Sequence, residues 1–121
     1  MFSYVTDILD KLEKNPKIDN TDTAIAHLRE LSLDDFGEVL LEMPMRKYPK
    51  LSSFLPKMAA DQVQQDWTGA SGMILLRQSL NFIRMMHYRS YKHQGSGLEG
   101  KTILDYGCGY GRLLRLSLIH I

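Results

Sequence analysis

Three glycines stand at alternate positions near the end of the chain: Gly107, Gly109 and Gly111. Glycine has no side chain, so a ligand can approach the backbone of such a turn closely. A glycine turn between a strand and a helix also presents backbone N–H groups to a ligand at the helix N-terminus. Asp105 stands two residues before the first glycine. This spacing predicts a small-molecule binding turn with a carboxylate at its edge.

Two common glycine-rich motifs do not fit these residues. The dinucleotide-binding fingerprint needs a third small residue at the position where Arg112 stands. A phosphate-binding loop of the Walker type ends in Gly-Lys-Ser or Gly-Lys-Thr, and the turn has no such ending. A carboxylate at Asp105 disfavours a pyrophosphate and favours a cationic ligand. The residues around the turn therefore point away from a bound phosphate.

Residues 103–114 resemble motif I of the class I S-adenosylmethionine-dependent methyltransferases and read Ile-Leu-Asp-Tyr-Gly-Cys-Gly-Tyr-Gly-Arg-Leu-Leu. The pattern of that motif is two apolar residues, Asp or Glu, and then three glycines at alternate positions. The resemblance implies that the turn wraps the methionine part of S-adenosylmethionine, whose α-ammonium and sulfonium are positively charged. The cofactor-binding residues that it implies are Asp105 at the acidic position, Gly107, Gly109 and Gly111, and Tyr106 and Cys108 through their backbone groups. The match covers about a tenth of the chain.

The resemblance also implies an α/β, Rossmann-like fold for the complete protein. In this chain it places one strand near the C-terminal end, at the β-forming run Thr102-Ile103-Leu104, which is apolar enough to be buried. The rest of the chain is expected to be mostly α-helical. We therefore expect a helical N-terminal region over residues 1–94. Residues 95–115 are expected to begin the methyltransferase domain, with its first strand, glycine-rich loop and helix start.

Apolar residues recur at helical spacing through most of residues 1–94, and capping residues divide this region into separate helices. The first predicted helix ends near Asn15-Pro16, the second starts at Asn20-Thr21-Asp22, and the third starts at Ser32 and ends at Pro44. A short helix is predicted over residues 61–66. The longest is predicted over residues 72–92, with Ser71 as its cap and Gly95 as its stop. Trp67 and the long helix loosely resemble the region that many such enzymes place over the cofactor. Trp67 can equally be a half-buried aromatic residue that anchors a helix end.

The last six residues, 116–121, match the translation of CTG TCT CTT ATA CAC ATC, the start of a transposase adapter used in sequencing libraries. We therefore expect this tail to be non-native; the alternative is a genuine helix continuation, which its Leu and Ile residues permit. The family also has an acidic residue for the ribose and a segment for the adenine beyond motif I, and neither is present after Gly111. We expect the chain alone to bind S-adenosylmethionine weakly and to be inactive.

Composition is that of an ordinary globular protein, with 44% hydrophobic and 24% charged residues. No apolar run reaches the roughly 20 residues of a membrane span. The single cysteine, Cys108, excludes an internal disulfide framework and favours a cytoplasmic location. Residues 1–42 contain ten acidic and four basic side chains, and residues 43–121 contain four acidic and eleven basic ones. The basic residues are scattered, so this asymmetry gives no clear nucleic-acid signature.

Two classes of function remain open. The favoured class is an S-adenosylmethionine-dependent methyltransferase, whose acceptor is a small molecule, a protein or a nucleic acid and whose oligomeric state is open. The alternative is a small helical interaction module, or another Rossmann-like nucleotide-binding protein, without methyl transfer. No catalytic residue is assigned. His27, His87 and His93 lack metal-ligand spacing, so no metal site is predicted.

Overall fold

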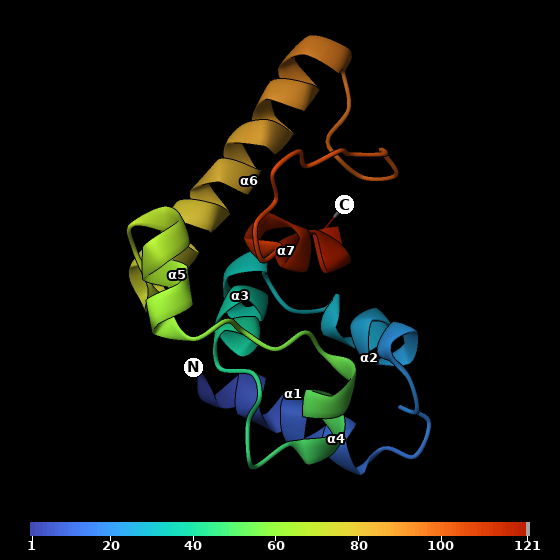
Figure 1. Ribbon diagram of the computed structural model, residues 1–121. Coiled ribbons are helices and arrows are strands. Elements are labelled where there is room, and N and C mark those ends of the chain that lie inside the picture. The colour runs from blue at the N-terminus through green and yellow to red at the C-terminus, as the bar shows by residue number, and fades with distance from the viewer. Residues whose placement is uncertain (121) are drawn as a thin grey trace. The chain divides into compact units, whose positions relative to one another are not determined.

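The computed structural model describes residues 1–120 of the chain and the side chains of residues 1–116. The side chains of residues 117–121, most of the predicted tail, lie outside the described residues. The chain divides into two compact units, Met1–Met58 and Ala59–Ile121, whose helices are labelled in Figure 1. The helices of the described residues are α1 (Ser3–Lys14), α2 (Thr21–Leu28), α3 (Leu33–Leu41), α4 (Pro49–Phe54), α5 (Asp61–Thr68), α6 (Gly72–Gln94) and α7 (Arg112–His120).

Unit 1, residues 1–58, holds α1 to α4 around an apolar core in which Leu9 and Phe36 are completely buried. Local side-chain caps set the starts of two helices. The Asn20 side chain accepts a hydrogen bond from the Thr23 N–H group at 2.9 Å at the start of α2. The Ser32 hydroxyl accepts one from the Asp35 N–H group at 3.1 Å at the start of α3. Both starts confirm the sequence predictions, because capping chemistry is readable from neighbouring residues.

The short helix α4 is held by side chains of α1. The Glu13 carboxylate accepts hydrogen bonds from the backbone N–H groups of Lys50 at 2.7 Å and Leu51 at 3.0 Å. These N–H groups belong to the first turn of α4 and therefore have no partner inside the helix. The Tyr48 hydroxyl, just before α4, donates to Asp10 at 2.8 Å. These contacts join residues 35 or more positions apart, and the sequence pattern did not predict them.

Unit 2, residues 59–121, is built on α6, which packs against both α5 and α7. Figure 1 shows the chain leaving the far end of α6 and returning as a loop to α7. α5 and α6 both end at a glycine in the left-handed conformation, Gly69 with φ 75° and Gly95 with φ 73°. Such glycines satisfy the last carbonyl groups of a helix without a steric penalty. The predicted stop at Gly95 is confirmed.

The start of α6 differs from the prediction. Ser71 occupies the N-cap position, but its side chain makes no capping hydrogen bond. The Gln64 side chain of α5 takes this role: its Oε1 accepts from the Gly72 N–H group at 3.0 Å, and its Nε2 donates to the Ala59 carbonyl at 2.6 Å. Gln64 is 1% exposed. A buried amide therefore ties α5 to the first turn of α6.

The strand predicted at Thr102-Ile103-Leu104 does not form. The backbone there is irregular, and residues 1–120 contain no strand. A strand requires a neighbour that completes its backbone hydrogen bonds, and no described segment pairs with this one. Leu104 is 88% exposed, so the burial that its apolar character predicted is absent too. The prediction of an α/β, Rossmann-like fold with one strand at the C-terminal end is therefore wrong, and the described chain is α-helical.

Candidate functional site

The glycine turn has a backbone conformation that only glycine adopts without strain. The φ angles of Gly107, Gly109 and Gly111 are 72°, 58° and 76°, all in the left-handed region. The Gly111 N–H group donates to the Cys108 carbonyl at 2.9 Å, and the Gly111 carbonyl accepts from the Arg115 N–H group at 3.1 Å. The second of these bonds lies at the start of α7. The residue types of the turn are therefore explained by its geometry.

A hollow of about 370 Å³ lies against this turn, and we call it the polar hollow. Its volume is within the range of small-molecule sites, about 300–1,000 Å³. All of its lining residues belong to unit 2. They are Gly107, Cys108, Gly109 and Tyr110 of the turn, Arg112 at the start of α7, Trp67 and Thr68 of α5, and Gln78 of α6.

Trp67 forms one wall of the polar hollow. A Cβ atom built on Gly109 would lie 3.4 Å from Cε3 of the Trp67 ring, so the indole lies directly against the turn backbone. The Trp67 side chain is nevertheless 68% exposed. A large aromatic surface is thus available beside the turn. Of the two interpretations of Trp67, this geometry favours the one in which it walls a pocket.

The polar hollow contains one charged side chain among its described lining residues, Arg112. Its Nη1 lies 3.5 Å from the hydroxyl of Ser79, a buried residue of α6. Burial raises the pKa of the neighbouring Tyr110, and the positive charges of Arg112 and Arg115 offset part of that increase. The Tyr110 hydroxyl is buried and has no hydrogen-bond partner among the described residues. The hollow is therefore lined by one cationic side chain among the described residues, and the Tyr110 hydroxyl is enclosed by protein atoms.

Asp105 lies in a different place from the polar hollow. It lines a second hollow of about 380 Å³, which we call the apolar hollow, together with Lys101. The remaining lining side chains are Phe82, Ile83 and Met86 of α6, Ile103 and Leu104 of the irregular segment, and Leu113 and Leu114 of α7. The structure therefore separates the predicted acidic position from the glycines.

The six predicted cofactor-binding residues are thus only partly brought together. Gly107, Cys108 and Gly109 line the polar hollow. Asp105 lines the apolar hollow, whereas Gly111 and Tyr106 line neither, and Tyr106 is 94% exposed. The turn forms as one local unit, but its acidic neighbour faces other side chains.

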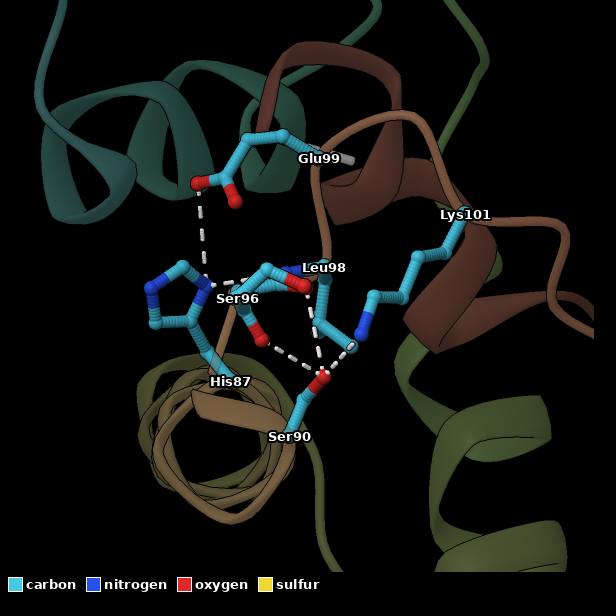
Figure 2. A network of polar contacts seen from close by, with 7 residues as sticks. His87, Ser90, Ser96, Leu98, Glu99 and Lys101 are labelled. Carbon is cyan, nitrogen blue, oxygen red and sulfur yellow. Dashed lines mark hydrogen bonds and ion pairs between the residues drawn. The ribbon is translucent and has the colours of Figure 1, made fainter. Parts of the chain in front are cut away.

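A polar network, drawn in Figure 2, fixes the loop that leads from α6 toward the turn. The Ser90 hydroxyl of α6 is within donating distance of the carbonyl groups of Ser96 at 2.9 Å and Gly97 at 3.2 Å. The Lys101 ammonium donates to the Ser90 hydroxyl at 2.6 Å and also to the Gln94 side chain. Lys101 is therefore attached to the last turns of α6, four residues before Asp105.

The other half of this network is centred on His87 of α6. The Leu98 N–H group donates to His87 Nδ1 at 3.4 Å, and the same nitrogen lies 3.7 Å from the Glu99 carboxylate (Figure 2). A Cβ atom at Gly97 would collide with both the imidazole and the Glu99 carboxylate. The loop therefore approaches α6 closely, and Gly97 is the residue that permits this approach.

The described residues do not assemble a further reactive group at the turn. Cys108 is a free, half-buried cysteine, and no histidine lines the polar hollow to activate it as a nucleophile. Among these residues no group of three or more His, Cys, Asp or Glu side chains is placed to hold a metal ion.

The comparisons with known proteins add no family to this description. No protein-family model, curated protein or solved structure matches the chain. In the part of the chain that the structure describes, no helix has the length and apolarity to cross a membrane. The functional argument therefore rests on the residues of unit 2.

Four residues that line the polar hollow were not predicted from the sequence: Thr68, Gln78, Tyr110 and Arg112. Arg112 entered the sequence analysis only as the residue that excludes a dinucleotide fingerprint, although its position directly after the glycines was a usable signal. Gln78 is an exposed residue of α6, and no pattern distinguishes it from its neighbours. Residues on separate helices meet here through tertiary packing, which local patterns do not encode.

Proposed function

We propose that this chain carries the cofactor-binding turn of an S-adenosylmethionine-dependent methyltransferase. The observation that carries the proposal is the left-handed conformation of Gly107, Gly109 and Gly111 beside a hollow of about 370 Å³. A Gly-x-Gly-x-Gly turn with this conformation exposes its backbone to a ligand. S-adenosylmethionine supplies the electrophilic methyl group on its sulfonium. The protein holds and orients the cofactor and excludes water around it.

In this proposal Asp105 acts on the cofactor through charge rather than by lining the same hollow. Its carboxylate stands two residues before the turn, and its negative charge attracts the ammonium and sulfonium groups of the cofactor. The methyl acceptor and the catalytic residue stay unassigned. A cytoplasmic location belongs to the same proposal, because the single cysteine of the chain is a free thiol.

The proposal is tested by titrating the isotope-labelled 121-residue chain with S-adenosylmethionine and recording backbone amide signals by NMR. This measurement detects weak binding, which is what we expect of the chain alone. The expected result is saturable shifts centred on the amides of residues 106–111. Asp105→Asn should lower the affinity by less than about tenfold, because a carboxylate that acts through its charge without a direct contact contributes less than a hydrogen bond to a charged group.

Asp66→Asn is the matched control for this substitution. Asp66 is an exposed carboxylate of α5 outside both hollows, and it accepts a hydrogen bond from Gln62. The control should bind S-adenosylmethionine with unchanged affinity. The proposed function is wrong if saturating ligand leaves the amides of the glycine turn unshifted. Equal affinities of Asp105→Asn and the unmodified chain would remove Asp105 from the site.

A helical interaction module is the second candidate, and one observation favours it. The apolar hollow is lined by several side chains that are also exposed, among them Leu104 at 88% and Phe82 at 40%. Exposed apolar surface of this kind is typical of protein contacts. This candidate predicts concentration-dependent association in analytical ultracentrifugation that Leu104→Asp abolishes, together with no response of the turn to S-adenosylmethionine.

A further inference from the structure

Segment 101–105 has a backbone that the rest of the chain does not pair. Within the described residues, no hydrogen bond involves the backbone groups of residues 102–105. The side chains in the middle of the segment are exposed, Ile103 to 38% and Leu104 to 88%. Exposed, unpaired N–H and C=O groups form a template for the backbone of another chain. The segment therefore has the features of an uncovered contact surface.

The apolar hollow lies beside this backbone and extends the same surface. Ile103 and Leu104 are among its lining residues. Phe82 of α6 and Leu114 of α7 also line it, and they are 40% and 43% exposed. Exposed apolar side chains that gather in one place are typical of a protein contact. A partner that pairs with the segment would therefore also cover apolar side chains of α6 and α7.

The two ends of the segment carry opposite charges. Lys101 and Asp105 both line the apolar hollow. Asp105 has no hydrogen bond or ion pair among the described residues. The Lys101 ammonium donates to the Ser90 hydroxyl (Figure 2) and to the Gln94 side chain, which leaves one of its three N–H donors. Each end of the segment can therefore accept a partner group of the opposite charge.

These charges make the segment complementary to itself in one orientation. When two copies run antiparallel with Ile103 facing Ile103, Lys101 of each copy faces Asp105 of the other. The Cβ atoms of facing residues in such a pair lie about 5 Å apart, within reach of an ion pair. In a parallel pair with the same residues aligned, Lys101 faces Lys101 and Asp105 faces Asp105, and like charges repel. Charge therefore favours the antiparallel arrangement.

We propose that segment 101–105 binds the same segment of a second copy of this chain in an antiparallel, two-fold symmetric contact, with Lys101 of each copy paired to Asp105 of the other. A two-fold contact uses the same patch on both copies, so each dimer contains two of these ion pairs. The inference goes beyond the proposed cofactor binding and names a partner for the second candidate function. The two hollows share no lining residue, so association and cofactor binding are separate properties. A small contact of this kind gives a weak dimer.

Sedimentation velocity of the 121-residue chain tests the association. The average sedimentation coefficient should rise with concentration between about 10 µM and about 1 mM, the range in which small interfaces form and dissociate. Asp105→Lys places two positive charges opposite each other in both pairs, and Lys101→Asp places two negative charges there. Each variant should weaken the association about tenfold or more. An equimolar mixture of the two variants should associate as the unmodified chain does, because opposite charges then face each other in both pairs.

The mixture also separates the effect of charge from an effect on the loop. Lys101→Asp loses the hydrogen bonds to Ser90 and Gln94, and this loss persists in the mixture, so recovered association reports charge pairing. Asp66→Lys is the matched control for Asp105→Lys. It makes the same change in charge at an exposed carboxylate of α5 outside both hollows, and it should associate as the unmodified chain does.

The alignment of the two segments has a readout of its own. In a Cys108→Ser background, Ile103→Cys should link two copies through a disulfide in a glutathione redox buffer, because position 103 faces itself across the contact. Thr102→Cys should stay unlinked, because position 102 faces Leu104 of the other copy and its own counterpart is farther away. Electrophoresis without reductant separates linked from unlinked chains.

The outcomes separate this inference from the proposed function. A sedimentation coefficient that stays constant up to about 1 mM overturns the self-association. Association that survives both charge variants, or a mixture that stays monomeric, overturns the pairing of Lys101 with Asp105. Linkage through Thr102→Cys but not through Ile103→Cys overturns the antiparallel alignment. Each of these results leaves the proposed function standing, because the response of the turn amides to S-adenosylmethionine decides it. Unshifted turn amides in a chain that associates overturn the proposed function alone.

Discussion

The buried amide of Gln64 is the joint between α5 and α6, and its removal should destabilise unit 2. Gln64→Leu keeps a side chain of similar volume while deleting the hydrogen bonds to Gly72 at 3.0 Å and Ala59 at 2.6 Å and a longer one to the Asp61 carboxylate at 3.5 Å. Because Leu fills the space, the change leaves no large cavity. The loss of stability therefore reports the deleted hydrogen bonds rather than a change in packing.

The expected loss of unfolding free energy depends on how deeply Gln64, Ala59 and Gly72 are buried. A neutral hydrogen bond contributes about 0.5–1.5 kcal/mol net, so the two short bonds, to Gly72 and Ala59, contribute about 1–3 kcal/mol. Gln64 is 1% exposed, but Ala59 and Gly72 are only half-buried, so water replaces part of what they lose. We expect a loss of about 1–2 kcal/mol. A unit of this size has a total stability of roughly 3–5 kcal/mol, so the effect is a large share of it.

Urea unfolding followed by the fluorescence of Trp67 measures this loss, because the single tryptophan lies in unit 2. With a denaturant slope of about 1 kcal/mol per molar urea, the midpoint should fall by about 1–2 M. Gln62→Leu is the control: Gln62 is exposed and its side chain bonds to Asp66 one turn later at 2.7 Å, so the urea midpoint of this variant should barely move. Equal urea midpoints for the two variants would refute the claim that the Gln64 side chain stabilises the contact between α5 and α6.

Three further predictions concern unit 1. Glu13→Ala should cost about 0.5–2 kcal/mol of unfolding free energy in urea titrations, because it uncaps the first turn of α4; a midpoint equal to that of the unmodified chain would contradict this cap. Hydrogen bonds from Lys47 and Tyr48 hold the pKa of Asp10 below its ordinary value of 3.8. A lowered pKa stabilises the folded chain above pH of about 4, so the destabilisation by Asp10→Asn should be present at neutral pH and should fade as the pH drops through the folded pKa. Phe36→Ala should cost about 3–5 kcal/mol and unfold unit 1, seen as lost helical circular dichroism, since Phe36 is 0% exposed.

Helix positions were predictable here because their signals are local. Asn20 and Ser32 cap helices through bonds that span three residues, and Gly95 stops α6 through its own backbone conformation. The glycine turn belongs to the same class, because each of its three glycines has the positive φ angle that the residue type permits. Features that are determined within one turn of the backbone can therefore be predicted from the sequence.

The predictions that were wrong depended on contacts with other parts of the chain. Ser71 has the right type and position for a cap, yet the Gly72 N–H group bonds to Gln64, which lies on another helix. The strand at residues 102–104 was inferred from its β-forming, apolar residues, but strand formation depends on a pairing partner that those residues do not specify. Asp105 is adjacent to the turn in sequence and still faces the apolar hollow. Proximity along the chain did not predict which side chains share a cavity.

The polar hollow is accordingly a property of unit 2 rather than of the glycine motif. The motif provides the turn backbone and Arg112, whereas Trp67, Thr68 and Gln78 come from α5 and α6. Trp67 reaches Gly109 because α5 packs on α6 and the Gln64 amide bonds to the first turn of that helix. Removing the Gln64 hydrogen bonds should therefore lower the affinity for a ligand at the turn, even though Gln64 lines neither hollow. If Gln64→Leu lowers the affinity measured from the NMR shifts of the turn amides, the stability of the α5–α6 pair is connected to the binding proposed for the turn.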